Sequence, residues 1–115
     1  MKKNYETNIE TCPLVDVQKI VQNKWAIVVM YYLQGETLRF GELSRKTPQV
    51  TQANLTKVLR TLEGAGLVHR EVYPVVPPKV EYSLTPIGQK FKIVLEALEL
   101  WSTEYVEMKK TETSA

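Results

Sequence analysis

The sequence has few of the residues that cross-link a chain or anchor it in a membrane. It has one cysteine, Cys12, so no disulfide can form within the chain, and a small secreted scaffold held by disulfides is excluded. The longest apolar run, Trp25 to Leu33, is far shorter than the roughly 20 residues that span a bilayer as a helix. The first residues contain no apolar block that would act as a secretory signal. We therefore expect a protein of the reducing cytoplasm with no membrane segment.

An excess of charge of one sign is also missing. The chain has 115 residues with 15 Lys+Arg and 13 Asp+Glu, and a net charge of +2 does not by itself indicate nucleic-acid binding. With 43% hydrophobic residues, the composition is that of one ordinary globular domain. We expect a flexible N-terminal arm over residues 1–10, a single domain over residues 11–109 and a loose polar tail over residues 110–115.

Patterns of catalytic and metal-binding residues are absent as well. We find no Ser, His and Asp order, no pair of carboxylates with a base and no glycine-rich phosphate loop. The single histidine, His69, has no Cys, His or carboxylate partners at metal-ligand spacing, so we expect a phosphate contact or a surface side chain there. The sequence thus predicts a protein that is not an enzyme and that holds neither a cofactor nor a metal.

Apolar periodicity predicts several helices in the first half of the chain. Pro13 opens a short amphipathic helix, and residues 24–34 are apolar nearly all round, which predicts a buried central helix. Residues 41–46 then form a short helix, and a second one begins after Thr51, a suitable N-cap, and ends at Gly66. Two short helices with a tight polar connection form the helix-turn-helix pattern.

Segments rich in Val and Tyr follow this helix pair. Residues 67–73 and 80–84 are separated by the proline-rich residues 74–79, which predicts a two-stranded hairpin with a stiff tip. Residues 38–40 form a short strand or a turn in this interpretation. The expected fold class is mainly α with a small β-hairpin wing, a winged helix-turn-helix with a long C-terminal dimerisation helix.

The long helix is predicted over residues 86–109, with Thr85 as its N-cap. Apolar residues recur along it at alternating steps of four and three, as in a heptad seam. The seam consists of Ile87, Phe91, Val94, Leu98, Trp101, Tyr105 and Met108. Either the helix packs only on its own domain, or one face meets a second chain. We favour the second interpretation, because Leu95 and Leu100 carry apolar surface onto other faces.

The second helix of the pair has a face suited to DNA. Opposite its apolar stripe lie Ala53, Lys57 and Arg60, with Asn54 beside them and Gln52 at the leading end. Asn and Gln pair with adenine, whereas Lys and Arg bind guanine or phosphate. Further cations are expected at the DNA backbone, namely Arg39, Arg45, Lys46 and Lys79. Acidic residues gather on the last helix instead, at Glu96, Glu99, Glu104, Glu107 and Glu112. The plainer alternative is that these charges only keep the surface soluble.

Short motifs between Cys12 and about Trp101 resemble the HxlR family of winged helix-turn-helix transcriptional regulators, relatives of the MarR group. The most specific are Val72-Tyr73-Pro74, Val76-Pro77-Pro78-Lys79-Val80-Glu81-Tyr82 and Leu84-Thr85, and others are Cys12-Pro13, Lys24-Trp25, Arg39-Phe40 and Gly66-Leu67-Val68. The resemblance implies a cytoplasmic homodimer that places two recognition helices in successive major grooves, with half-sites about 34–36 Å apart. Where the family often has a cation and then an apolar residue, this chain has Ala53 and Asn54. Its operator preference is therefore in doubt.

The predicted site joins these observations to double-stranded DNA with two half-sites. Phosphate contacts are expected from Arg39, Arg45, Lys57, Arg60 and Lys79. Base reading is expected from Thr51, Gln52, Asn54 and Lys57. The alternative is a winged-helix module that binds a protein and no DNA, since a fold does not fix a function. Such a module would expose apolar or acidic residues on the face that carries Lys57 and Arg60.

Cys12 precedes Pro13 at the predicted start of the first helix, where unsatisfied N–H groups favour a thiolate. The resemblance implies sensing of an oxidant or electrophile, because several family members use an N-terminal cysteine in this way. With one cysteine per chain, a disulfide would join two subunits or one subunit and a small thiol. In the alternative interpretation Cys12 is an inert, packed side chain, and the nearby Glu10 disfavours the thiolate.

Overall fold

The computed structural model describes residues 12–114, so the expected flexible arm over residues 1–10 lies outside the described residues. The helices are α1 (Pro13–Val21), α2 (Ala26–Tyr32), α3 (Phe40–Lys46), α4 (Gln52–Gly64), α5 (Pro86–Lys90) and α6 (Lys92–Ser114). The strands are β1 (Leu38–Arg39), β2 (Val68–Tyr73) and β3 (Lys79–Leu84). The predicted class, mainly helical with a small wing, is confirmed.

One apolar core lies beneath the helix pair. The apolar stripe of α4 is fully turned inward, and Leu55, Leu59 and Leu62 are almost completely buried. They pack against α2, whose Val29 and Met30 are also fully buried. Burying side chains of this size contributes about 1.5–3 kcal/mol each. This packing therefore holds α4 firmly, with its opposite face outward.

Helix α2 differs from the expectation of a central helix that is buried all round. It is shorter than residues 24–34, because it begins at Ala26 and its last turn leads into Gly35, whose φ of 65° breaks the helix. Its other side, with Ile27, Val28 and Tyr31, is only partly covered. The reason is that α4 fills one side of α2, whereas α6 touches the other side only along its first turns.

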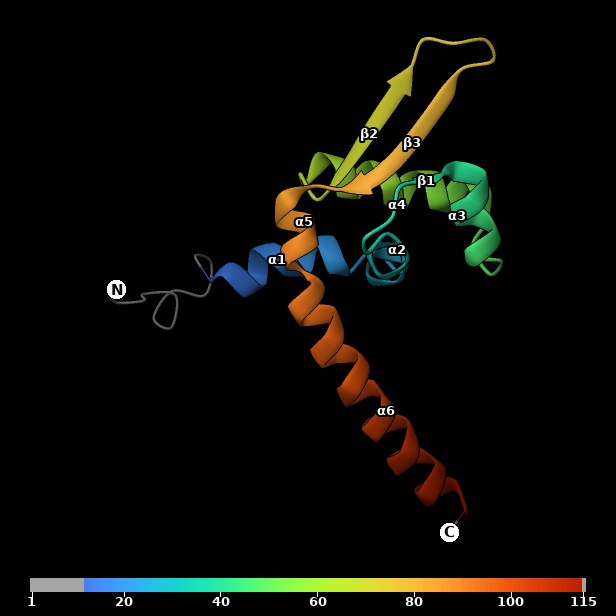
Figure 1. Ribbon diagram of the computed structural model, residues 1–115. Helices are drawn as coiled ribbons and strands as arrows, with labels where there is room; N and C mark the ends of the chain where they lie inside the picture. Colours follow the sequence, from blue (N-terminus) through green and yellow to red (C-terminus); the bar gives the residue numbers. More distant parts are fainter. Residues whose placement is uncertain (1–11, 115) are drawn as a thin grey trace.

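The sheet has three strands in the order β1-β3-β2, all antiparallel, rather than the two of the predicted hairpin. The short β1 pairs with β3 through Leu38 opposite Tyr82 and Arg39 opposite Glu81. Beyond that pairing, β2 and β3 continue alone and project from the body as a wing (Figure 1). The third strand therefore fastens the base of the wing to the helix pair.

The predicted continuous helix over residues 86–109 is interrupted at Phe91. The N–H of Phe91 donates to the carbonyl of Gly88 at 3.1 Å, a tight turn that separates α5 from α6. Helix α5 is docked closely, because Thr85 Oγ1 donates to the carbonyl of Gly66 at 2.6 Å and accepts from the Gly88 N–H at 3.2 Å. A Cβ at Gly88 would collide with the Leu67 carbonyl oxygen. Tertiary contacts thus fix α5 in a direction that α6 does not share.

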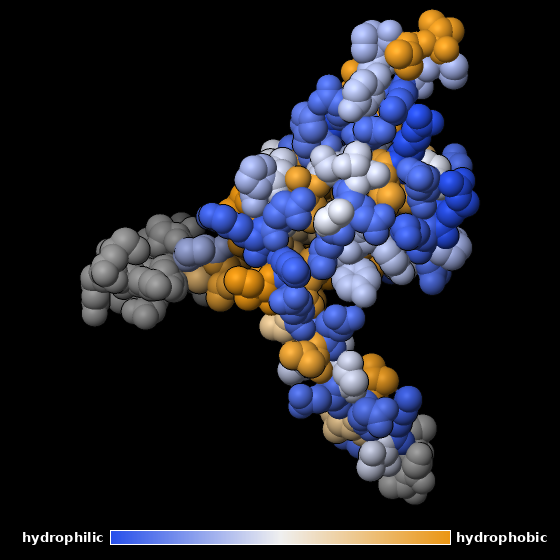
Figure 2. Space-filling view, viewed as in Figure 1, coloured by the Kyte–Doolittle hydropathy of each residue, from blue (hydrophilic) through white to orange (hydrophobic). Residues whose placement is uncertain are grey.

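Helix α6 extends away from the rest of the molecule (Figure 1). It runs to Ser114, so the tail expected to be loose from residue 110 is helical up to that point. The radius of gyration is 17.1 Å, compared with about 13 Å for a compact chain of this length. Leu95 is the residue of α6 that enters the core, with 3% of its surface exposed. Hydrophobic surface recurs along α6 and gathers where α1 meets its beginning (Figure 2).

Candidate nucleic-acid interface

Local hydrogen bonds cap both ends of α3 and the start of α4. Glu42 accepts from the Arg39 N–H at 2.8 Å at the start of α3, and the buried Thr47 hydroxyl donates to the Leu43 carbonyl at 3.0 Å at its end. Thr51 Oγ1 accepts from the Asn54 N–H at 3.1 Å, which confirms Thr51 as the N-cap of α4. Local hydrogen bonds therefore fix both ends of α3 and the start of α4, and a short connection over residues 47–51 joins the two helices.

The outward face of α4 carries the side chains expected there. Gln52, Ala53, Asn54, Lys57 and Arg60 are all exposed, while the apolar stripe points into the core. No carboxylate occurs in α4 before Glu63. Because α4 packs on the core with its inner side, its outer face is held in place, and the side chains on that face are neutral or basic.

One flank of α4 faces the connection between α1 and α2. A polar hollow of about 250 Å³ lies there, and its lining combines two lysines with amide side chains. The lining residues are Asn23, Lys24, Trp25, Gln49, Asn54, Lys57 and Val58. Lys24 was not among the predicted contacts, although it lies beside two of them. A cation in a polar connection between two helices was the sequence signal that could have identified it.

The other flank of α4 faces the wing. Thr56, Arg60 and Glu63 line a smaller hollow of about 210 Å³ together with Arg70 and Tyr82 of the wing strands. Arg70 Nε lies 3.5 Å from Glu63 Oε1, so this second additional cation is paired with a carboxylate. Arg60 shares the hollow and contributes positive charge beside that pair. The two flanks thus differ: Lys24 and Lys57 meet no carboxylate in their hollow, whereas Arg70 does.

Lys79 is less available for a phosphate contact than its position at the wing predicted. It is half-buried, its Nζ lies 3.4 Å from Glu81 Oε2, and the ammonium stands 4.8 Å from the centre of the Tyr73 ring. Glu81 lies directly opposite Glu71 in the ladder, and such like-charge pairs are unfavourable. The Lys79 ammonium offsets the charge of Glu81, and His69 Nε2 forms a hydrogen bond of 2.8 Å with Glu71 Oε1. The charge of Glu81 also raises the pKa of Tyr73 above its ordinary value of 10.0.

The remaining predicted cations lie on neighbouring elements. Arg39 is exposed on β1, in register with Glu81 on β3, and Arg45 is exposed in the last turn of α3. Lys46, next to Arg45, stands 5.8 Å from the centre of the Tyr32 ring. Helix α3 and the wing lie at the end of the molecule away from α6 (Figure 1). The structure thus brings α4, α3 and the wing together on one side, with Lys24 added to the predicted set.

A second surface is apolar and lies around α1, α5 and the beginning of α6. A hollow of about 250 Å³ is lined almost entirely by carbon, from Val17, Ile20, Val21, Met30, Leu67, Ile87, Lys90, Phe91 and Val94. Farther along α6, Trp101 and Tyr105 stack with ring centres 5.2 Å apart, and 59% of Trp101 is exposed. The heptad seam is therefore largely uncovered within one chain.

Cys12 is the N-cap residue of α1, half-buried and not in a disulfide. Its carbonyl accepts from the Val15 N–H at 3.0 Å, and its side chain makes no capping hydrogen bond. Within residues 12–114, no cluster of three or more His, Cys, Asp or Glu side chains could hold a metal ion. None of the helices in that range combines the length and apolarity that crossing a membrane requires.

A helix pair with an exposed second helix, followed by a three-stranded sheet with a projecting hairpin, defines a winged helix-turn-helix protein. A family model described as HxlR-like helix-turn-helix matches residues 20–110. The chain belongs to this HxlR-like family, as its motifs indicated.

Its relatives are named as transcriptional regulators. It is 42% identical over 100 residues to the uncharacterized HTH-type transcriptional regulator YybR of Bacillus subtilis, and the match covers 87% of this chain and 80% of YybR. The redox regulator HypR in its reduced form is similar in structure, with a TM-score of 0.80 and 36% identity over 87% of this chain and 99% of HypR. A protein described as a MarR-family transcriptional regulator from Porphyromonas gingivalis W83 has a TM-score of 0.78 and 35% identity, covering 83% of this chain and 93% of that one.

Proposed function

We propose that this chain is a cytoplasmic, homodimeric, sequence-specific DNA-binding regulator that acts without catalysis, cofactor or metal. The observation that supports it most is the outward face of α4, which is rigidly supported, exposed and free of carboxylates before Glu63. Asn and Gln at its leading end suit adenine, and Lys57 and Arg60 suit guanine or phosphate. A module that binds a protein would present apolar or acidic side chains on this face.

The contacts divide into two groups in this proposal. Base reading falls to Gln52, Asn54 and Lys57, with a smaller share for Thr51, because its oxygen already caps α4. Phosphates are bound by Arg39, Arg45, Lys57, Arg60 and Lys79. Lys79 contributes less than the others, because Glu81 and the Tyr73 ring already engage its ammonium.

Fluorescence anisotropy with labelled DNA tests the proposal. The DNA upstream of the gene for this protein is compared with shuffled DNA of the same length at several salt concentrations. Gln52→Ala and Asn54→Ala should each remove about 1–3 kcal/mol of discrimination between the two sequences, with little loss on shuffled DNA. Gln89→Ala makes the same chemical change on α5 and should alter neither affinity. Equal weakening on both DNAs would exclude base reading by these residues, and no binding at any salt would favour the protein-binding module.

Dimerisation is proposed through the apolar surface of α1, α5 and α6. The exposed seam, with Trp101 and Tyr105 stacked on it, has the heptad spacing that pairs helices. Two chains would present two α4 helices to half-sites about 34–36 Å apart on the DNA. Sedimentation measures the oligomeric state directly, and a monomer at micromolar concentration would contradict this part of the proposal.

A response to oxidants or electrophiles through Cys12 is proposed as a second part. Two observations favour it: Cys12 is the N-cap residue of α1, half-buried and not in a disulfide, and the similar structure HypR is named a redox regulator. Oxidation would link Cys12 to the same residue of a partner or to a small thiol. An oxidant should change the DNA affinity of the wild type and leave Cys12→Ser unchanged. An equal response of both proteins would make Cys12 a packed, inert side chain.

A further inference from the structure

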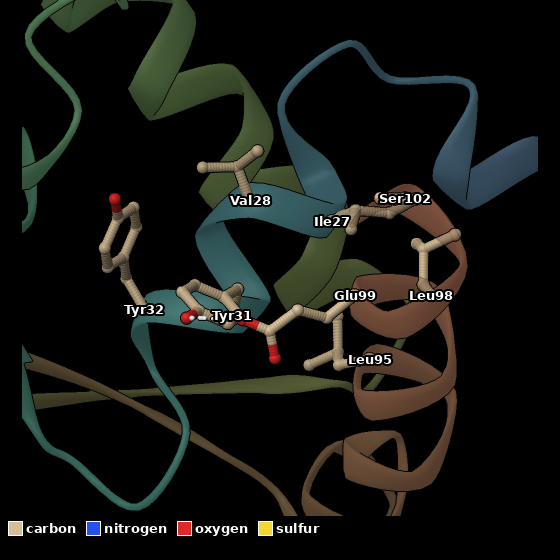
Figure 3. A pocket seen from close by; sticks show the side chains of 8 residues that line it. All are labelled: Ile27, Val28, Tyr31, Tyr32, Leu95, Leu98, Glu99 and Ser102. Atoms are coloured by element: carbon tan, nitrogen blue, oxygen red, sulfur yellow. Dashed lines mark hydrogen bonds between the residues drawn. The ribbon is translucent and has the colours of Figure 1, made fainter. Parts of the chain in front are cut away.

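A groove between α2 and α6 lies apart from the surface proposed for DNA. It has a volume of about 320 Å³, at the lower end of the roughly 300–1,000 Å³ typical of small-molecule sites. The side chains from α2 are Ile27, Val28, Tyr31 and Tyr32, and those from α6 are Leu95, Leu98, Glu99 and Ser102 (Figure 3). Carbon atoms form most of its walls, so the groove favours a small ligand with an apolar body.

One carboxylate gives the groove its charge. Tyr31 donates its hydroxyl hydrogen to Glu99 Oε2 at 3.3 Å, and no Lys, Arg or His is among the eight lining residues (Figure 3). The Tyr31 and Tyr32 rings stand edge to face with their centres 5.4 Å apart. The Lys46 ammonium stands 5.8 Å from the centre of the Tyr32 ring and is not among the lining residues. A carboxylate beside aromatic rings and an apolar wall matches an ammonium group on a small hydrocarbon body.

We propose that this groove binds a small organic amine, with the ammonium at Glu99 and the apolar body against Ile27, Leu95 and Leu98. Without a ligand, the neutral Tyr31 hydroxyl donates to the Glu99 carboxylate, whose charge raises the pKa of Tyr31, and an ammonium would take the place of this hydroxyl. A neutral molecule of the same shape would leave the carboxylate without a charged partner. The site therefore selects by charge as well as by size.

Occupation of the groove also affects the helix that carries the DNA-facing side chains. Helix α2 contacts α4 through Val29 and Met30 on one side and forms the groove on the other. An ammonium at Glu99 competes with the Tyr31 hydroxyl, which joins α2 to α6. The amine thus changes how α2 and α4 are held against α6, and with it the affinity for DNA. This regulatory consequence rests on the proposed DNA binding, whereas the amine site itself does not.

Amide NMR shifts of the isotope-labelled protein test the site without DNA. Benzylamine is the probe, and benzyl alcohol is its neutral counterpart of similar shape. Benzylamine should shift amides in residues 27–32 and 95–102 in a saturable way, and benzyl alcohol should bind much more weakly. Glu99→Gln should weaken benzylamine binding roughly 10- to 100-fold, because a charge-assisted hydrogen bond is lost.

Glu96→Gln is the matched control, because it removes the same charge one turn away on α6, outside the groove. It should bind benzylamine as the wild type does. Ser102→Phe, which fills the groove from a partly exposed position, should abolish binding with the fold intact. Equal affinity of the wild type and Glu99→Gln, or of amine and alcohol, would overturn the inference. So would a Glu99→Gln variant in which self-association changes but benzylamine affinity does not, since the groove would then belong to the dimer.

The two proposals fail separately in this design. A wild type that binds benzylamine but no DNA would refute the proposed function and leave the amine site standing. A wild type that binds DNA and shows no saturable shift with benzylamine would refute the amine site alone. A wild type that binds both, with an unchanged DNA affinity at saturating benzylamine, would remove the regulatory consequence.

Discussion

Large apolar side chains are mostly buried in the head of the molecule, residues 26–84, and mostly exposed in helix α6. In the head the apolar stripe of α4 and the side of α2 that carries Val29 and Met30 are buried, and the outward face of α4 is polar. In α6 only Leu95 of the described side chains is buried, while Leu100 and Trp101 are 70% and 59% exposed. The head therefore contains most of the core, to which α6 adds Leu95, whereas most of the apolar face of α6 is uncovered within one chain. If α4 binds DNA and α6 joins two chains, as proposed, substitutions in the two regions should disrupt the two properties separately.

The largest expected effect comes from the joint between these two parts. Gly88→Ala should destabilise the protein by about 3 kcal/mol, because the new Cβ meets the Leu67 carbonyl oxygen and lies 3.3 Å from the Leu84 Cβ. Unlike a flexible side chain, the backbone of Leu67 cannot move aside, since its carbonyl accepts from the Thr85 N–H. Urea unfolding measures the loss.

Gly64→Ala is the control for this change. Gly64 lies in the last turn of α4, and a Cβ there would meet nothing within 4 Å. The substitution should be neutral or stabilise the helix by about 0.5–1 kcal/mol. If Gly88→Ala were as mild as Gly64→Ala, the close docking of α5 on the head would be wrong.

The next effect concerns the exposed seam of α6. Trp101→Ala should weaken self-association by about 2 kcal/mol, or roughly 30-fold, and leave the unfolding of the head unchanged. Sedimentation across a range of concentrations measures it. Thr103→Ala, on the opposite side of α6, should have no effect. An unchanged dimer in Trp101→Ala would move the interface away from this part of the seam.

A smaller effect is expected from Lys24, one of the two cations beside α4 that sequence reasoning missed. Lys24→Ala should lower the affinity for specific and shuffled DNA alike and make the salt dependence shallower by about 0.9 per lost phosphate contact. The reason is that Lys24 shares its hollow with Asn54 and Lys57. Lys92→Ala removes the same charge from the start of α6 and should leave the salt dependence as it is. An effect as large in Lys92→Ala would mean that net charge alone is measured.

The smallest effect is a shift in the titration of one tyrosine. The pKa of Tyr31 lies above 10.0 because Glu99 disfavours the phenolate, so the contact favours folding below pH 10 and loses its effect as the pH rises through the raised pKa. In an absorbance titration, Tyr31→Phe should remove a late-titrating phenol, and Glu99→Gln should make that phenol titrate earlier. Glu81→Gln should do the same for Tyr73, in the wing. Tyr73 also titrates late, so its contribution is subtracted first. If Tyr31→Phe did not reduce the remaining absorbance change at high pH, the contact between α2 and α6 would be contradicted.

Local signals predicted the helix pair well. Thr51 and the stripe of α4 were identified correctly, because an N-cap and a periodic apolar face depend on residues close in the sequence. The interruption at Phe91 was missed, because it depends on the docking of Gly88 against Leu67, which lies far away in the sequence. The incomplete burial of α2 was missed for the same reason: apolar composition does not say how much surface the neighbouring helices cover.

The candidate site shows the same limit. The outward position of Lys57 and Arg60 followed from helical geometry alone. The surroundings of Lys79 did not, because strand register sets the Tyr73 ring opposite Lys79 and sets Glu71 opposite Glu81, the carboxylate that Lys79 contacts along β3. Lys24 reaches the flank of α4 only through the packing of the connection between α1 and α2. Sequence thus predicted which face is presented, and tertiary structure determines which of its charges are available.

Because the helix is interrupted at Phe91, a rotation at this turn would move α6 as one long rod relative to the head. With 23 residues, α6 is about 34 Å long, so a rotation of about 10° at the turn moves its far end by about 6 Å. One base-pair step of DNA is about 3.4 Å along the axis. In a pair of chains joined along α6, as proposed, a rotation of about 10° at this turn would swing each head and change the separation of the two α4 helices by a distance on the order of a base-pair step. In the proposed dimer, the geometry of this turn would therefore help to set the spacing of the two half-sites.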